Sequence, residues 1–161
     1  MIKKSSILIL TMFGLGNSKY APGTAASFVT CLIYIFFFNF QIDIVFLILG
    51  VSLISIYSVY SIDKFKNSFS ETDAKEIVVD EFIGQSIPVL TIYSFLEKSD
   101  IDIFILYTFI SFILFRIFDI LKPYPINKID QNIKNGLGVI LDDVVAGIYS
   151  IIIFIILTLF L

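Results

Sequence analysis

Hydrophobic residues are gathered in long runs that short polar stretches separate. The five main runs are residues 25–40, 44–62, 82–96, 103–120 and 144–161. A helix that crosses a bilayer needs about 20 predominantly apolar residues, and these runs approach that length. The pattern predicts an all-α fold, a polytopic membrane helical bundle with about 4–5 hydrophobic segments, in a single domain over residues 1–161. Pro88 interrupts the third run, which leaves a kinked crossing and a re-entrant segment as alternatives.

The N-terminal stretch resembles the start of a signal peptide, because Lys3 and Lys4 precede an apolar run at residues 7–13. That run is too short to span a bilayer, and we expect the segment to be retained. Residues 14–24 predict a turn-rich loop. Its glycines allow backbone N–H groups to approach an anion, and Thr24 is a candidate N-cap of the next helix. An ordinary loop between helices is the alternative.

Composition strengthens the membrane prediction and removes several kinds of chemistry. Of the 161 residues, 58% are hydrophobic, and the mean hydropathy is +0.97, far above what a soluble domain needs. Cys31 is the single cysteine, so it forms no intrachain disulfide, and packing is its simplest role. The absence of histidine excludes histidine nucleophiles, general bases and metal ligands.

Basic residues are distributed unevenly between the two sides that five crossings would create. One side would hold Lys3, Lys4, Lys19, Lys64, Lys66, Lys75, Arg116, Lys122, Lys128 and Lys134. The other side would hold only Lys98. Because cytoplasmic loops carry an excess of lysine and arginine, we expect the N-terminus in the cytoplasm and the C-terminus outside.

A charged stripe ends the fourth run. Arg116, Asp119 and Lys122 recur every three residues, so on a helix they follow one side. Pro123 and Pro125 then end that helix. A charge at the bilayer centre costs about 2.5–3.5 kcal/mol on insertion scales, so such groups usually lie at an interface or line a cavity.

Two acidic pairs border the later runs. Asp80 and Glu81 precede the third run, and Asp142 and Asp143 open the fifth, where acidic residues suit a helix N-terminus. In the expected topology, both pairs lie on the same cytoplasmic side as the stripe that begins at Arg116 and as the glycine-rich loop. We therefore predict one composite site at the mouth of the bundle.

Carboxylates without histidine or cysteine suit Mg²⁺, which prefers oxygen ligands. The candidate ligands are Asp80, Glu81, Asp119, Asp142 and Asp143. Arg116 and Lys122 supply the positive charge that a phosphate site needs. This set predicts phosphoryl transfer or hydrolysis, with water and a transiently phosphorylated carboxylate as alternative nucleophiles. A cysteine phosphatase is excluded, because the sequence has no Cys-x₅-Arg loop.

Purely structural interpretations stand beside the functional ones. Asp80 and Glu81 could simply be acidic residues in the first turn of a helix. Arg116 and Asp119 could form a structural ion pair that holds two helices together. Lys122 could be a lysine at the membrane interface whose charged end reaches toward water. Gly84 and Gly147 are better explained by close helix packing than by ligand contact.

Four sequence blocks resemble the phosphatidylglycerophosphatase A family. They are APGT at residues 21–24, IVVDEFIG at 77–84, FRIFDILKPYPI at 115–126 and GLGVILDDVVAG at 136–147, in that family's order. The resemblance implies a Mg²⁺-dependent phosphatase, multi-pass in the bacterial inner (cytoplasmic) membrane, with its active site on the cytoplasmic side. Such an enzyme removes the terminal phosphate of phosphatidylglycerophosphate to give phosphatidylglycerol and phosphate. The implied partners are this lipid and the membrane, with no nucleic acid.

The resemblance also implies the roles of individual residues. The catalytic set is Asp80, Glu81, Arg116, Asp119, Lys122, Asp142 and Asp143. The residues expected at the substrate are Gly23, Thr24, Lys19, Lys128 and Asp130. Residues 16–20, residues 73–76 and Tyr124 depart from the family's pattern, but none of these positions is one of the core acids.

Two other functions fit parts of the pattern. A metal-dependent lipid headgroup transferase would also place acids at a cytosolic interface, but the Asp-Gly…Ala-Arg pattern expected of one is missing. A small membrane transporter would use Arg116 and Asp119 as a gate, and it predicts charges spread through the bilayer depth. Here the charges bunch on one side, which favours the phosphatase.

Overall fold

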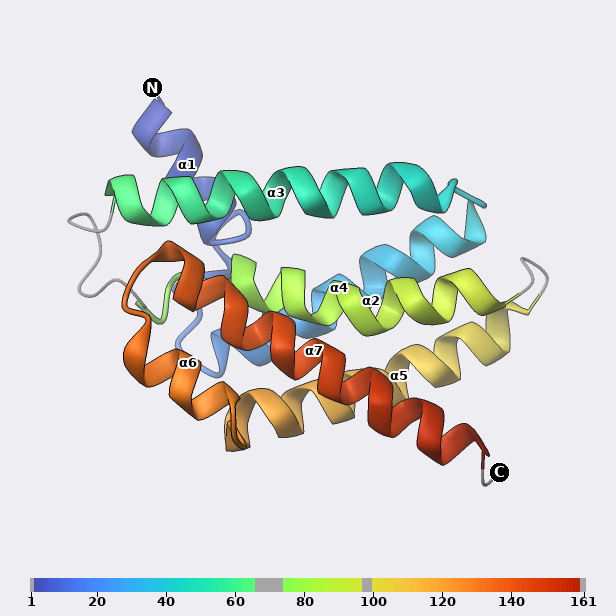
Figure 1. The fold of residues 1–161 in the computed structure, drawn as a ribbon. Helices are drawn as coiled ribbons and strands as arrows, with labels where there is room; N and C mark the ends of the chain where they lie inside the picture. The colour runs from blue at the N-terminus through green and yellow to red at the C-terminus, as the bar shows by residue number, and fades with distance from the viewer. Residues whose placement is uncertain (1, 66–73, 97–99, 160–161) are drawn as a thin grey trace.

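The computed structural model describes residues 2–65, 74–96 and 100–159, and every regular element in these ranges is helical (Figure 1). The α-helices are α1 (Ile2–Leu10), α2 (Pro22–Asn39), α3 (Ile44–Phe65), α4 (Val79–Phe95), α5 (Ile101–Leu121), α6 (Ile126–Asn132) and α7 (Gly136–Leu159), with a 3₁₀ turn, η1, at Leu15–Asn17. The all-α prediction is confirmed for the described residues.

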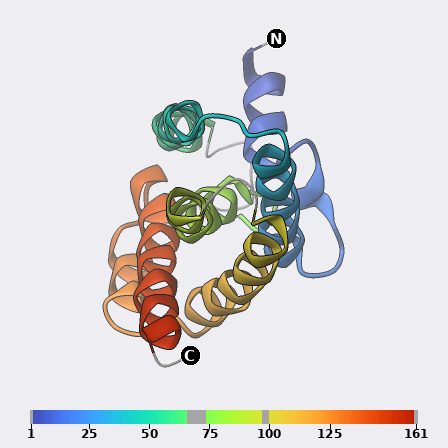
Figure 2. The same ribbon diagram turned by 90° about the vertical axis from the view of Figure 1, so that its right-hand side faces the viewer.

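In the described ranges, four helices, α2, α3, α5 and α7, are long and apolar enough to cross a membrane. Large apolar side chains, such as Leu53 on α3 and Leu106 on α5, are exposed on them, as lipid-facing positions require. The 17-residue α4 is not among these four, and it packs in the middle of the bundle against α2, α3, α5 and α7 (Figures 1 and 2). Pro88 lies inside α4 and the helix continues through it.

Close packing between α4 and α7 depends on glycine. A Cβ added at Gly84 would lie 2.7 Å from the backbone oxygen of Asp143 and 2.7 Å from Cε2 of Phe115. A Cβ added at Gly147 would lie 2.5 Å from the backbone oxygen of Gly84. The prediction that these two glycines allow close helix packing is confirmed, and this approach brings Asp143 against the first turns of α4.

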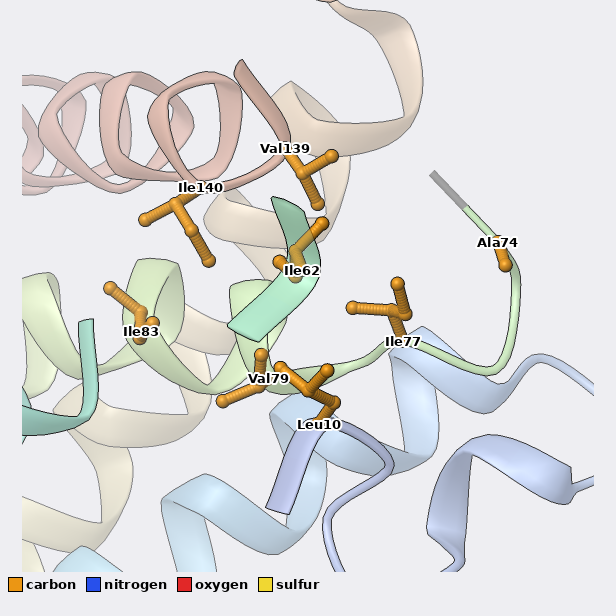
Figure 3. Packing of buried hydrophobic residues seen from close by; sticks show 8 residues of the cluster. All are labelled: Leu10, Ile62, Ala74, Ile77, Val79, Ile83, Val139 and Ile140. Carbon is orange, nitrogen blue, oxygen red and sulfur yellow. The ribbon is translucent and has the colours of Figure 1, made fainter. Parts of the chain in front are cut away.

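A buried apolar cluster fixes the helix ends that carry the charged residues. Leu10 of α1, Ile62 of α3, Ile83 of α4 and Ile140 of α7 all belong to it (Figure 3). Each of these side chains is at most 4% exposed. The start of α4 and the start of α7 are therefore held rigidly beside one another, as a precise site needs.

Several predicted boundaries are corrected. The helix that was expected to open at Asp142 begins at Gly136, so the acids lie in its second turn rather than at its N-terminus. The Gly136 N–H donates to Oδ1 of Asp63 at 2.7 Å, which supports the earlier start. Thr24 is not an N-cap, because α2 begins at Pro22 with Ala21 in the capping position.

The segment between α5 and α7 is more ordered than the polar loop expected there. It contains the short helix α6, while α5 ends at Leu121 as Pro123 and Pro125 predict. Lys122 follows in the left-handed conformation, with φ 42°. The chain thus turns sharply at this residue, and α6 packs on α7.

Candidate active site

Three carboxylates from two helices converge at one end of the bundle. Asp80 and Glu81 lie in the first turn of α4, and Asp143 lies in the second turn of α7. One carboxylate oxygen from each falls within 4.8 Å of the others. Asp80 is 8% exposed and Asp143 is 3% exposed. Because buried like charges repel one another strongly, this arrangement calls for a positive partner.

Arg116 supplies positive charge on one side of the three carboxylates. Its Nη1 forms an ion pair with Asp119 one turn along α5, and it lies 4.0 Å from Oε1 of Glu81. The same nitrogen donates a hydrogen bond of 3.5 Å to Oγ of Ser27 on α2. The ion pair of Arg116 and Asp119 is therefore present, but the expectation that it joins two helices is wrong, because both residues lie on α5. Arg116 instead joins α2, α4 and α5 through its contacts with Ser27 and Glu81.

Ser27 is a residue of the site that was not predicted from the sequence. The signal for it is its position four residues after Gly23, which places the two on one face of α2. Gly23 itself is buried against the site, because a Cβ there would overlap Oε1 of Glu81 and lie 3.3 Å from Nη1 of Arg116. Glycine is thus what allows the start of α2 to reach the carboxylates.

Lys122 forms a second cationic contact at the end of α5. Its Nζ donates to Oδ2 of Asp142 at 2.7 Å and lies 3.0 Å from Oδ1 of Asp130 on α6. Burial lowers the pKa of Lys122, but the hydrogen bonds and negative charges of Asp142 and then Asp130 outweigh it and hold the pKa above its ordinary value. Lys122 therefore stays charged at neutral pH and ties together α5, α6 and α7.

The structure divides the predicted acids into two kinds. Asp80, Glu81 and Asp143 share one small volume, whereas Asp119 and Asp142 each pair with a cation. This division favours the first three as direct ligands of a metal ion. The metal-binding role predicted for the other two stays a prediction.

Some of the residues predicted to bind substrate lie next to residues of the site, and others are exposed. Thr24 is half-buried beside Gly23, and Asp130 contacts Lys122. Lys19 and Lys128 are exposed, and neither forms an ion pair within the described part of the chain. Their roles at a substrate stay predictions.

The site has unsatisfied buried polar atoms that suit a charged ligand. Among the described residues, Oε2 of Glu81, Oδ2 of Asp143 and Nε of Arg116 are buried and accept or donate no hydrogen bond. Such atoms are rare in folded proteins and call for an ion, a water molecule or a ligand. Hard carboxylate oxygens of this kind fit Mg²⁺.

The fold and the site together define an integral membrane protein with a carboxylate and arginine centre suited to phosphate chemistry. A comparison with protein families matches residues 8–158 to the family described as Phosphatidylglycerophosphatase A. The chain belongs to this family of lipid phosphatases, so the resemblance seen in the sequence is confirmed. No solved structure matches the chain.

Individual relatives agree with this assignment. A Haemophilus influenzae protein named Phosphatidylglycerophosphatase A is 32% identical over 94% of this chain and 91% of its own length. An Escherichia coli protein of the same name is 32% identical over 89% of this chain and 77% of its own length. A Bacteroides thetaiotaomicron protein with the provisional name phosphatidylinositol-3-phosphatase is 36% identical over 91% of this chain and 89% of its own.

Replacing Gly23 with alanine is expected to lower phosphate release by about 10²-fold, because a small misplacement in an active site has an effect of that size. The added Cβ would displace the carboxylate of Glu81, the far end of a flexible side chain, without moving a helix backbone. We therefore expect the melting temperature in detergent to stay nearly unchanged. A melting temperature that falls in step with activity would show that Gly23 serves only helix packing.

Proposed function

We propose that this protein hydrolyses phosphatidylglycerophosphate to phosphatidylglycerol and phosphate, and that the reaction depends on Mg²⁺. The observation that carries the proposal is the convergence of Asp80, Glu81 and Asp143 beside Arg116. Family membership supports a lipid phosphatase, and the names of the two relatives from H. influenzae and E. coli support this substrate.

The carboxylates that would hold the ion are Asp80, Glu81 and Asp143. When bound there, Mg²⁺ would neutralise charge on the phosphoryl group, which is the main requirement of phosphoryl transfer. Three carboxylates carry more negative charge than one divalent ion, and Arg116 beside Glu81 offsets part of the excess.

The residues of the chain then have separable tasks. Arg116 would bind the oxygens of the terminal phosphate, with Asp119 and Ser27 holding its guanidinium in place. Hydrolysis forms a bond between the oxygen of water and phosphorus and breaks the bond to the glycerol oxygen, which leaves with a proton. A route through a phosphorylated carboxylate reaches the same products in two such steps.

We place the site at the cytoplasmic face of the inner membrane. The four apolar helices support a membrane location, and the relatives are bacterial. The strong bias of lysine and arginine toward the side of the acidic site supports the cytoplasmic side. In this position the lipid phosphates lie level with the first turn of α4 while the acyl chains lie among the helices.

The provisional name of the B. thetaiotaomicron relative makes phosphatidylinositol 3-phosphate a second candidate substrate. The purified protein should be assayed with each lipid in Mg²⁺. We expect phosphate release from phosphatidylglycerophosphate to have a kcat/KM at least about tenfold higher, since a site that fits one headgroup disfavours another. Faster release from the inositol lipid would reverse the assignment. No release from either lipid would favour the transferase or transporter.

A further inference from the structure

An apolar groove of about 620 Å³ lies between α2 and α3, with α4 at its base. Figure 2 shows α2 and α3 on different sides of α4. The walls include Ile33 and Phe37 from α2 and Leu47 and Ile54 from α3. The turn after α1 closes one end with Met12. Almost all of the lining is apolar, so the groove does not favour water.

The groove borders the first turn of α4, which also carries two acids of the candidate active site. Val79 and Phe82 line the groove, and the two residues between them are Asp80 and Glu81 of the carboxylate centre. Part of the groove's wall therefore lies in the same helical turn as these two acids. Along α3 the lining runs from Phe46 to Ile54, which is about 12 Å at 1.5 Å per residue.

We infer that this groove binds an acyl chain of the lipid whose phosphate is hydrolysed. The inference rests on the proposed function and extends it to a chain-binding subsite. An apolar space beside the helical turn that carries the acids has the chemistry and the position that the tail of a bound lipid phosphate would need. Its volume lies within the roughly 300–1,000 Å³ typical of ligand pockets.

A second protein helix fits the groove poorly. A helix is about 10 Å across, and the lining extends only about 12 Å along α3, or about two helical turns. A transmembrane partner would need a much larger trough. The remaining competitor is a bulk phospholipid of the bilayer, which photolabelling distinguishes from the substrate.

Gly50 offers a way to fill the groove without damaging the fold. It lines the groove from the second turn of α3, and a Cβ there meets nothing within 4 Å. Gly50→Ala, Gly50→Leu and Gly50→Phe add increasing bulk to this space. Ser52→Phe is the matched control, because Ser52 is exposed and lies about 160° from Gly50 around the helix at 100° per residue.

The first readout is a ratio of activities. Phosphatidylglycerophosphate is assayed with two oleoyl chains and with two hexanoyl chains, which are too short to fill the groove. We expect Gly50→Phe to lower the long-chain to short-chain ratio of kcat/KM at least tenfold through KM, with Gly50→Leu intermediate and Ser52→Phe equal to wild type. An unchanged ratio in Gly50→Phe would overturn the chain-binding subsite while leaving the phosphatase proposal intact.

The second readout does not require turnover. Wild-type protein is photolabelled with phosphatidylglycerophosphate that carries a diazirine at the end of one acyl chain, and the labelled peptides are mapped by mass spectrometry. We expect labelling of residues 29–37 and 46–54, lost in Gly50→Phe. Equal labelling by a diazirine phosphatidylcholine, or labelling confined to the outer helix faces, would assign the groove to bulk lipid and overturn the inference. Groove labelling without any phosphate release would instead refute the proposed hydrolysis.

Discussion

Asp143→Asn is expected to lower phosphate release by about 10³-fold and to raise the melting temperature of the metal-free protein. The activity falls because one of three converging carboxylates becomes a neutral amide of the same shape. The stability rises because the substitution removes one buried negative charge from among like charges. A gain of about 1 kcal/mol would raise the melting temperature by about 2–4 °C.

The opposite signs of these two effects separate catalysis from folding. Phosphate release and thermal melts in EDTA should be compared for wild type, Asp143→Asn and Asp102→Asn. Asp102 is an exposed acid in the first turn of α5, so its amide variant should match wild type in both measurements. Retained activity in Asp143→Asn, or a fall in both activity and melting temperature, would remove Asp143 from the proposed centre.

Lys122→Met is expected to lower both stability and activity. Removing one partner of a buried ion pair costs about 3–5 kcal/mol, and we expect about 1–3 kcal/mol here because the Lys122 side chain is 29% exposed. Loss of the Lys122 charge beside Asp142 would also change the electrostatics at the neighbouring Asp143, so phosphate release should fall about 10²-fold. Thermal melts and the phosphate assay measure both effects, with exposed Lys134→Met as control.

The stabilising effect of Lys122 should not depend on pH near neutrality. Its pKa is raised in the folded protein, so the contribution is complete below the ordinary lysine pKa and is lost only as pH rises through the higher, folded-state value. The difference in melting temperature between wild type and Lys122→Met should therefore be constant between about pH 6 and 9. A difference that fell steadily across this range would show that Lys122 is not held charged by its two acids.

The sequence predicted the parts of the fold that face lipid better than the parts that face protein. The apolar run at residues 44–62 lies within α3, because lipid contact requires hydrophobic side chains along the helix. The start of α7 was missed because Gly136 and Gly138 resemble loop residues, although they let the helix pack closely on its neighbours. The short polar helix α6 has no apolar run to mark it.

The site was predictable in its composition but not in its internal pairing. Charged residues in a membrane protein are costly to expose to lipid, so they usually pair with one another or line a cavity. The clustering of Asp80 and Asp143 was therefore predictable from the sequence. Which acid faces a cation depends on helix rotation, and only the structure shows Asp142 directed to Lys122. The apolar groove likewise follows from the positions of α2 and α3 on α4, which no periodicity encodes.

The central claim is that three acids from two helices bind a divalent ion. Paramagnetic Mn²⁺ tests this claim most directly, because it takes the same oxygen ligands as Mg²⁺. Electron paramagnetic resonance of the purified protein should show bound Mn²⁺ that excess Mg²⁺ displaces. We predict that Asp80→Asn, Glu81→Gln and Asp143→Asn each weaken this binding at least about tenfold. Wild-type affinity for Mn²⁺ in all three variants would contradict the account.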